Sequence, residues 1–287
     1  MPELPEVEVV KKSLDTKLKN LTIKKVNISN NKLRYKIDSL QFNKIEGQKI
    51  ISIKRRSKYL LINLNKGTTI LSHFGMTGKF FIINKDKKFK TSFYYSLNKK
   101  DTKHDHVTFF FTKKIKLIYN DVRKFGFIKI FHSKDVFNCA HLVNLGPEPL
   151  SNNFNLGYVE KFIFNKNLKI KDLLMNQKFV AGLGNIYCNE ILFLCKIKPT
   201  RNVKNINQKE IKDILKNTKK ILKKAILLGG SSIKNFSSTE GQGGNFQQKF
   251  NVYGREKTSC SRVNCLGTIK KHYTSNRSSF FCSKCQK

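Results

Sequence analysis

The first residues of the chain, M-P-E-L-P-E-V-E, place a proline and an acid where they could do covalent chemistry. A proline after the initiator methionine favours removal of that methionine, which would leave Pro2 with a free secondary amine beside Glu3. The reference pKa of an N-terminal amine is roughly 7.7–8.0, against roughly 10.4 for lysine, so more of it is unprotonated at neutral pH. Such an amine can attack an electrophilic carbon and hold it as an iminium ion. The alternative is that Pro2 and Pro5 only begin a helix, because proline suits the first helical turn.

Four of the seven cysteines form two pairs near the end of the chain, Cys260-x4-Cys265 and Cys282-x2-Cys285, separated by 16 residues. This spacing is typical of a tetrahedral zinc site of four thiolates, which leaves no vacancy for the nearby His272. The segment from Phe250 to the end of the chain contains few apolar residues and needs such a cross-link to fold. We predict one structural zinc ion and no catalytic metal. The remaining cysteines, which we expect to be unreactive core residues, are Cys139, Cys188 and Cys195.

The charge of the chain indicates a nucleic-acid partner. Lys and Arg number 57 against 19 Asp and Glu, a formal net charge of +38, and clustered basic side chains neutralise phosphates and release counterions. The alternative is codon drift, because the chain is also rich in Asn, Ile and Phe, as an AT-rich genome would produce. Only eight of the basic residues are arginines, so these side chains are the more informative indication of nucleic-acid binding. With no signal peptide and no apolar run of roughly 18 residues, we expect a cytoplasmic protein without a membrane partner.

The first half of the chain carries the pattern of one helix followed by many short strands. A helix is predicted from Pro5 to about Asn20, with Val7, Val10, Leu14 and Leu18 on one face. Turn residues at 65–67 and 112–114 predict hairpin connections in the strand region, which extends to about Phe131. Many short strands of this kind favour an antiparallel sandwich or barrel. The predicted strands are Lys49–Ile53, Tyr59–Leu64, Thr68–His73, Lys79–Ile83, Val107–Phe111 and Ile115–Tyr119.

The second half is predicted to be helical. The run Gly146-Pro147-Glu148-Pro149 breaks both helix and strand and marks a domain boundary. Asn207 could cap the longest helix, and Gly229-Gly230 would end it. The polar, glycine-rich segment 237–244 is predicted to be a mobile loop. The expected helices are Ile170–Met175, Asn189–Leu194 and Ile206–Leu228, and the expected domains are 1–148, 149–249 and 250–287.

Seven short motifs, in order along the chain, resemble those of the formamidopyrimidine-DNA glycosylase family, bacterial enzymes that excise oxidised purines from DNA. They are P-E-L-P-E-V-E at the start, K-Y-L-L at 58–61, H-F-G-M-T-G at 73–78, K-H-D-H-V at 103–107, R-K-F-G at 123–126, L-G-P-E-P-L at 145–150 and G-L-G-N-I-Y at 182–187. The resemblance implies an α+β multidomain protein. Its N-terminal antiparallel β-sandwich with an N-terminal helix would precede a helix–two-turn–helix domain and a β-hairpin zinc finger.

The resemblance also implies roles for four catalytic residues. Pro2 would attack C1′ of the damaged nucleoside, and Glu3 would protonate the ring oxygen so that the sugar opens as an iminium. After the base leaves, β- and δ-eliminations would cut both flanking phosphates. Lys58 and Arg277, the latter at the tip of the zinc hairpin, would contact phosphates beside the lesion. From the sequence alone, a strand-edge lysine is normally solvated and a lone arginine is more often a solvated surface residue.

Five further residues would contact DNA once the damaged base is flipped out of the stack. Met76, Arg123 and Phe125 would fill the hole and meet the orphaned partner base, since Met is adaptable, Phe can wedge between base steps and Arg offers several donors. Without the flanking motifs, Met76 and Phe125 would be interpreted as core residues. His104 and Asn185 would contact phosphates.

Two positions depart from the pattern of this family. Val122 stands where a proline is common, which relaxes the turn before Arg123, and the first cysteine pair has x4 where x2 is usual.

We therefore expect a monomeric base-excision-repair enzyme that acts on double-stranded DNA containing an oxidised purine, such as 8-oxoguanine or formamidopyrimidine, or an abasic site. We place it in the bacterial cytoplasm, associated with the nucleoid. Two alternatives stay open. One is the related endonuclease VIII type, which prefers oxidised pyrimidines. The other is a DNA-binding relative that has lost catalysis, against which an intact Pro2-Glu3 pair argues.

Overall fold

The computed structural model describes residues 1–84, 87–90, 101–231 and 246–287. The predicted loop at 237–244 lies outside the described residues. The chain forms two compact units: Met1–Val143 with Leu228–Asn245, and Asn144–Leu227 with Phe246–Lys287. The separation of the second unit into a helical domain and a zinc finger stays a prediction. No helix in the described ranges is long and apolar enough to cross a membrane.

The first unit contains the N-terminal helix α1 (Leu4–Leu18) and two antiparallel sheets. In the five-stranded sheet the order is β1 (Ile23–Ile28), β7 (Asp105–Phe111), β8 (Lys116–Asn120), β5 (Lys79–Asn84) and β6 (Lys87–Lys90). In the four-stranded sheet it is β2 (Ile50–Arg56), β3 (Tyr59–Leu64), β4 (Thr68–His73) and β9 (Phe127–His132). Smaller elements are α2 (Ser39–Asn43) and the 3₁₀ turns η1 (Asp101–His104), η2 (Thr112–Lys114) and η3 (Val136–Asn138).

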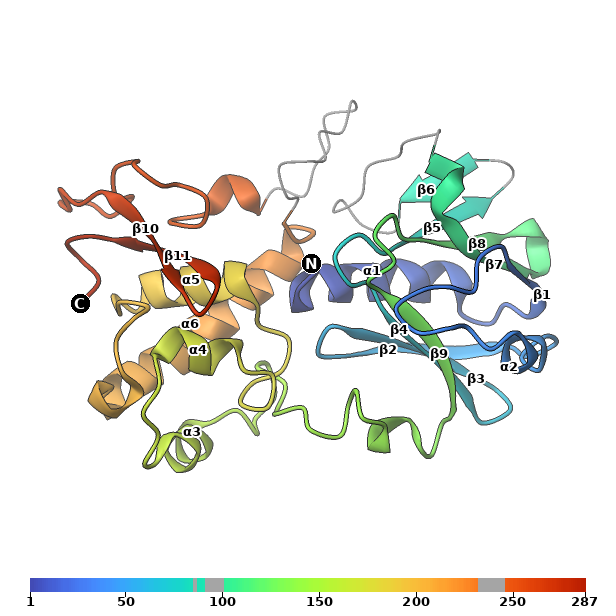
Figure 1. Cartoon of the computed structure of the whole chain (residues 1–287), viewed down its shortest axis with the longest axis horizontal. Coiled ribbons are helices and arrows are strands. Elements are labelled where there is room, and N and C mark those ends of the chain that lie inside the picture. The colour runs from blue at the N-terminus through green and yellow to red at the C-terminus, as the bar shows by residue number, and fades with distance from the viewer. Residues whose placement is uncertain (85–86, 91–100, 232–245) are drawn as a thin grey trace. The chain divides into compact units, whose positions relative to one another are not determined.

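One hydrophobic core joins α1 and both sheets, and Figure 1 shows α1 in blue running along the layer between them. The predicted helix face is confirmed, since its four apolar residues are at most 1% exposed. Two polar contacts fix the helix on β2: Glu8 accepts from Arg55 Nε at 2.7 Å, and Asp15 accepts from the backbone N–H of Ile53 at 3.2 Å. The predicted β-sandwich with an N-terminal helix is therefore confirmed.

A reciprocal capping box starts α1. The Glu6 carboxylate accepts the backbone N–H of Glu3 at 3.0 Å, and the Glu3 side chain accepts the backbone N–H of Glu6. The other oxygen of Glu6 accepts from both the backbone N–H and the hydroxyl of Ser231, each at 2.9 Å. One buried carboxylate thus fixes the first turn of the helix and the chain 225 residues later.

The second unit is helical and ends in a β-hairpin. Its helices are α3 (Leu156–Ile163), α4 (Ile170–Met175), α5 (Asn185–Leu194) and α6 (Gln208–Leu227), its strands are β10 (Ile269–Thr274) and β11 (Arg277–Cys282), and its 3₁₀ turns are η4 (Val203–Asn205) and η5 (Gln247–Lys249). The predicted cap is confirmed: Asn207 Oδ1 accepts from the backbone N–H of Glu210 at 2.9 Å, while Glu210 accepts from that of Asn207 at 3.0 Å. Helix α5 begins four residues earlier than we expected, because Gly184 is its N-cap and Asn185 its first residue.

Candidate functional site

The Pro2-Glu3 pair lies at the buried start of α1. Pro2 is buried and the side chain of Glu3 is 3% exposed, so neither is part of a solvated tail. Glu3 is the N-cap residue of the helix, where the partial positive charge of the helix dipole stabilises a carboxylate. Because α1 is itself fixed on β2, the position of the pair is set by secondary structure.

Lys58 is not the solvated strand-edge residue that the sequence alone allowed. It lies in the turn between β2 and β3, after Ser57 with φ 55°, and is 7% exposed. The neighbouring pair in the β3–β4 register is Tyr59 and His73. The pKa of His73 is lowered to about 4, first by burial and then by the nearby charges of Lys58, Arg34, His141 and the N-terminal amine. Lys58, Arg34 and the N-terminal amine therefore all act on His73 at this end of the sheet.

Met76, Arg123 and Phe125 meet although they come from separate loops. Arg123 Nη1 lies 3.2 Å from the sulfur of Met76, and its guanidinium carbon lies 4.5 Å from the centroid of the Phe125 ring. Met76 and Phe125 are 44% and 46% exposed. Their interpretation as core residues is therefore wrong, because both apolar side chains are presented to solvent around one guanidinium.

The two loops that carry these residues touch backbone to backbone. A Cβ atom added to Gly75, which has φ +55°, would lie 2.4 Å from the carbonyl carbon of Phe125. One added to Gly126 would lie 2.0 Å from the hydroxyl of Tyr119 and 2.5 Å from the carbonyl oxygen of His73. The glycines of H-F-G-M-T-G and R-K-F-G are needed for this contact, which brings the loops together.

Asp121, which the sequence analysis did not single out, joins the same two loops. Its side chain is fully buried and accepts from the Thr77 hydroxyl at 2.5 Å and from the backbone N–H of Gly126 at 2.8 Å. Its backbone carbonyl lies 2.8 Å from Nε2 of the buried His106, and its backbone N–H donates to the carbonyl of His104 at 3.1 Å. The side chain of His104 is partly exposed. The sequence signal that could have identified Asp121 is an acidic residue that follows a strand and precedes the R-K-F-G motif.

The tip of the β10–β11 hairpin presents Arg277 to solvent. Thr274 pairs with Arg277, and the two residues between them, Ser275 and Asn276, have φ values of 48° and 58°. Two residues in this conformation make the tight turn that matches the twist of a hairpin. The predicted hairpin and the place of Arg277 at its tip are therefore confirmed, while its contact with a phosphate stays a prediction.

Polar side chains of α4 and α5 fix the hairpin within the second unit. Asn185 donates from Nδ2 to the carbonyl of Ser278 at 3.0 Å, so its amide positions the hairpin. Lys171, which is fully buried, donates to the same carbonyl at 2.8 Å and to the hydroxyl of Ser279 at 2.8 Å. Asn189 accepts the backbone N–H of Phe280 at 2.8 Å. Sequence reasoning missed Lys171, because nothing local distinguishes it from the other lysines.

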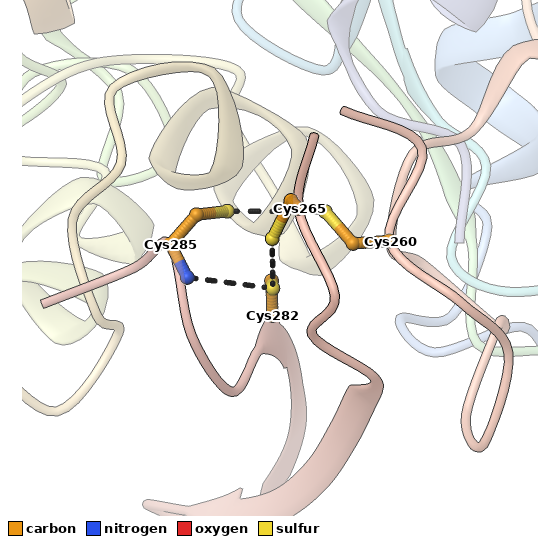
Figure 2. Close-up of side chains that lie close together, drawn as sticks. All are labelled: Cys260, Cys265, Cys282 and Cys285. Atoms are coloured by element: carbon orange, nitrogen blue, oxygen red, sulfur yellow. Dashed lines mark hydrogen bonds between the residues drawn. The ribbon is translucent and has the colours of Figure 1, made fainter. Parts of the chain in front are cut away.

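The four cysteines form a cluster that can hold a metal ion (Figure 2). All four Sγ atoms lie within 4.8 Å of one another, with 3.8 Å between those of Cys260 and Cys285 and 3.6 Å between those of Cys265 and Cys282. A tetrahedral zinc ion with bonds of about 2.3 Å would separate its sulfur ligands by about 3.8 Å, so the cluster fits it. His272 is not a member of the cluster. The predicted metal-binding group is therefore confirmed; that the metal is zinc stays a prediction.

The longer first cysteine pair packs on the C-terminal end of α5. Arg262, inside the x4 segment, donates through Nη2 to the carbonyls of Phe193 and, at 3.2 Å, Leu194. Its guanidinium carbon also lies 4.6 Å from the centroid of the Phe193 ring. A cation at a helix C-terminus is favoured by the helix dipole. The departure from x2 spacing thus leaves the cysteine cluster intact and adds an anchor to the helix.

Among the other cysteines, only Cys188 is fully buried, whereas Cys139 and Cys195 are partly exposed. Burial raises the pKa of Cys195 to about 12, which keeps it in the unreactive thiol form.

Comparison with known proteins identifies the family to which this fold and these residues belong. The model of the formamidopyrimidine-DNA glycosylase N-terminal domain matches residues 1–128, and that of the formamidopyrimidine-DNA glycosylase H2TH domain matches residues 145–237. The chain is 40% identical over 287 residues to the formamidopyrimidine-DNA glycosylase of Rickettsia bellii, covering 100% of both proteins. It is 35% identical to that of Roseobacter denitrificans, with the same coverage.

Solved structures agree with the sequence relatives. A complex of the Lactococcus lactis enzyme with abasic-site DNA superposes with a TM-score of 0.86 at 32% identity, covering 99% of each chain. The fold and site therefore define a DNA glycosylase and abasic-site lyase of base-excision repair. The chain belongs to the formamidopyrimidine-DNA glycosylase family.

Proposed function

We propose that this enzyme excises oxidised purines, 8-oxoguanine and formamidopyrimidines, from double-stranded DNA through an iminium at Pro2 and then cleaves the abasic strand by β,δ-elimination. The observation that carries the proposal is the exposed cluster of Met76, Arg123 and Phe125, together with a buried Pro2-Glu3 pair in the same unit. A solvent-exposed Met and Phe around a guanidinium suit the space left by a flipped base better than they suit any role in the core.

The chemistry needs only groups that this chain supplies. After removal of Met1, the Pro2 nitrogen attacks C1′ while Glu3 donates a proton to the ring oxygen. The sugar opens as its C1′–oxygen bond breaks, the base departs with the electrons of its bond to C1′ and takes up the proton lost by the Pro2 nitrogen, and the Pro2–C1′ iminium remains. Loss of a C2′ proton then drives elimination of the 3′ phosphate, and a second elimination releases the 5′ phosphate. Water finally hydrolyses the iminium. Lys58 and Arg277 would neutralise phosphates beside the lesion.

DNA binding supports the same assignment. The Lactococcus lactis relative has been solved with DNA containing an abasic site, and a point mutant of it with DNA containing Fapy-dG. We assign phosphate contacts to His104 and to the N-terminal turn of α5 at Asn185, and a structural zinc ion to the four cysteines. The three predicted domains, 1–148, 149–249 and 250–287, would carry catalysis, backbone binding and the Arg277 hairpin. The enzyme would act as a monomer on nucleoid DNA.

Arg123 would read the base opposite the lesion. Arginine offers only donors, and cytosine left without its partner exposes the acceptors O2 and N3, whereas adenine turns its amino donor towards the same guanidinium. A good contact of this kind discriminates by about 1–3 kcal/mol, or roughly five- to a hundred-fold. We therefore expect 8-oxoguanine opposite cytosine to be excised well ahead of 8-oxoguanine opposite adenine.

Oxidised pyrimidines are the second candidate substrate class. The same Lactococcus lactis enzyme has also been solved with DNA containing an oxidised pyrimidine. Binding of such DNA by a relative does not set a preference, so relative rates on the two lesion classes decide between them.

Borohydride trapping tests the mechanism. Incubation with 8-oxoguanine duplex and borohydride should leave a protein–DNA adduct on the N-terminal peptide, and a tag retained ahead of Pro2 should abolish it. An adduct that maps to a lysine, or none although Met1 is shown to be removed, would contradict the role of Pro2. The non-catalytic alternative predicts DNA binding without any adduct.

Single-turnover excision tests the substrate. The three duplexes are 8-oxoguanine opposite cytosine, 8-oxoguanine opposite adenine, and an oxidised pyrimidine. Arg123→Ala should flatten the cytosine-to-adenine ratio, while Met76→Ala should slow both purine substrates together. Faster excision of the pyrimidine by the wild type would show that the enzyme has the substrate preference of the endonuclease VIII type.

A further inference from the structure

The backbone of Arg123 is held by a side chain from the opposite loop. Its N–H donates to the hydroxyl oxygen of Thr77 at 3.0 Å, and the same hydroxyl donates its proton to Asp121 at 2.5 Å. Thr77 thus uses its hydroxyl in both directions, as acceptor from one loop residue and donor to another. The second oxygen of Asp121 accepts the N–H of Gly126 at 2.8 Å, so the loop is held at both ends.

The contacts that hold Arg123 are separate from those that its side chain makes. Among the described residues, the guanidinium contacts the side chains of Met76 and Phe125, which are 44% and 46% exposed, and it can leave them when DNA arrives. The backbone contacts end on Asp121, whose side chain is 0% exposed. A hydrogen bond from a hydroxyl to a buried carboxylate is charge-assisted and roughly twice as strong as one between neutral groups.

Within the turn itself, the backbone N–H of Lys124 donates to the carbonyl of Asp121 at 3.3 Å. Val122 is 45% exposed, and Lys124 adopts a φ of 57°. This left-handed conformation costs free energy in any residue other than glycine. A local sequence of this kind does not by itself fix the direction of Arg123. Thr77 and Asp121 therefore add a side-chain restraint, across 44 residues of chain, to the close backbone approach at Gly75 and Gly126.

We propose that Thr77 and Asp121 are positioning residues that pre-organise Arg123, and with it the discrimination of the base opposite the lesion. The inference rests on the proposed role of Arg123 in the enzyme's function. Its physical basis is that a guanidinium held on a fixed backbone loses less conformational freedom when it meets the partner base. Because Met76 directly precedes Thr77, the same hydroxyl fixes the loop that presents the sulfur.

The chain offers a matched set of threonine variants as a test. Thr77→Val removes the hydroxyl with almost no change of shape, and Thr77→Ser restores it. Thr69→Val is the control, because the hydroxyl of Thr69, a buried residue of the first unit, also has two partners, Asn63 and Ser133, each at 2.8 Å. Each variant is measured by amide hydrogen exchange without DNA and by single-turnover excision opposite cytosine and adenine.

The expected results separate positioning from general destabilisation. Thr77→Val leaves the Arg123 N–H without its acceptor, so its protection from exchange should fall by about five- to 150-fold. The cytosine-to-adenine ratio should fall by about fivefold or more in the same variant. Thr77→Ser should keep both values near wild type. Thr69→Val should lower global stability while leaving the Arg123 amide and the ratio unchanged.

Two outcomes overturn the inference: unchanged Arg123 protection and ratio in Thr77→Val, or an equal loss of the ratio in Thr69→Val. Failure of the proposed function looks different. A wild type with no preference for cytosine would remove the base-reading role of Arg123 and the discrimination that we derive from it. Loss of Arg123 protection in Thr77→Val would then still establish that the hydroxyl holds this loop.

Discussion

His73 allows a pH-dependent property of the first unit to be calculated in advance. Its Nδ1 accepts the backbone N–H of Gly75 at 3.1 Å, and its ring packs against Tyr59 and Phe127, with centroids 4.9 and 5.8 Å away. Burial, followed by the charges of Lys58, Arg34, His141 and the N-terminal amine, lowers its pKa to about 4. The imidazole is therefore neutral at pH 7, as an acceptor for Gly75 must be.

The sign and size of the effect on stability follow from linkage. In the unfolded chain the pKa of this histidine is 6.5, so on acidification the unfolded state takes up the proton first. The stabilisation is fully present above pH 6.5 and is lost as the pH falls from 6.5 to about 4. A difference of about 2.5 pKa units corresponds to about 3 kcal/mol of unfolding free energy.

A non-titrating variant isolates this contribution. In His73→Asn the amide oxygen takes the place of Nδ1 and keeps the acceptor for Gly75. The variant should lose about 3 kcal/mol of the pH dependence between pH 6.5 and 4, measured by denaturant unfolding. His132→Asn is the control, because His132 ends β9 in the same sheet and is exposed. An NMR titration of His73 in the native protein near 6.5, or an unchanged pH dependence in His73→Asn, would refute the reasoning.

Three further predictions concern the second unit. Glu190→Gln should destabilise the second unit by about 3 kcal/mol or more in thermal unfolding. The buried carboxylate accepts four N–H hydrogen bonds of 2.9 Å from Asn251, Val252 and Tyr253, two on each oxygen. In glutamine one of these oxygens becomes an NH₂ group, which would face two N–H donors. Cys282→Ser should lower the metal content below one ion per chain in elemental analysis and weaken DNA binding, since a structural metal site contributes folding free energy directly; full retention of both would contradict the site. Arg262→Ala should speed release of the metal to a chelator, whereas Lys284→Ala, which removes a charge from the same region, should not; equal rates would show that the Arg262 anchor is unimportant.

Local patterns predicted the elements that need no distant partner for their definition. The strands Tyr59–Leu64 and Thr68–His73 and the helix Ile170–Met175 have the predicted bounds, and the turn residues at 65–67 mark the connection between the two strands in the sequence. The cysteine cluster was also predictable, since the spacing of thiolates within each pair limits what the segment can form. Strands β1 and β9 were not singled out, because their short alternations resemble much of the lysine-rich chain.

Long-range contacts account for what the sequence left out. The burial of Lys58 depends on a turn that folds back towards His73, and the fully buried Lys171 depends on a hairpin that follows it by about a hundred residues. Asp121 acquires its role only when Thr77 is brought beside it by the pairing of β5 with β8. Residue type predicted which groups could do chemistry, whereas the groups that hold them in place became visible only in three dimensions.

The double use of the Glu6 carboxylate limits how this gene can change. A single G-to-A transition converts a glutamate codon into a lysine codon, which is the direction in which an AT-rich genome drifts. Such a change costs little free energy where the glutamate is exposed and makes no contacts. At position 6 it would place an ammonium group against the N–H groups of Glu3 and Ser231. The neighbouring Gly230 has φ +80°, and a Cβ atom added to it would lie 3.2 Å from Glu6 Oε1. We therefore expect residues 6, 230 and 231 to be conserved together among relatives. Loss of activity in a Glu6 variant would then result from the lost contact between the start of α1 and Ser231, and not from the loss of a proton donor.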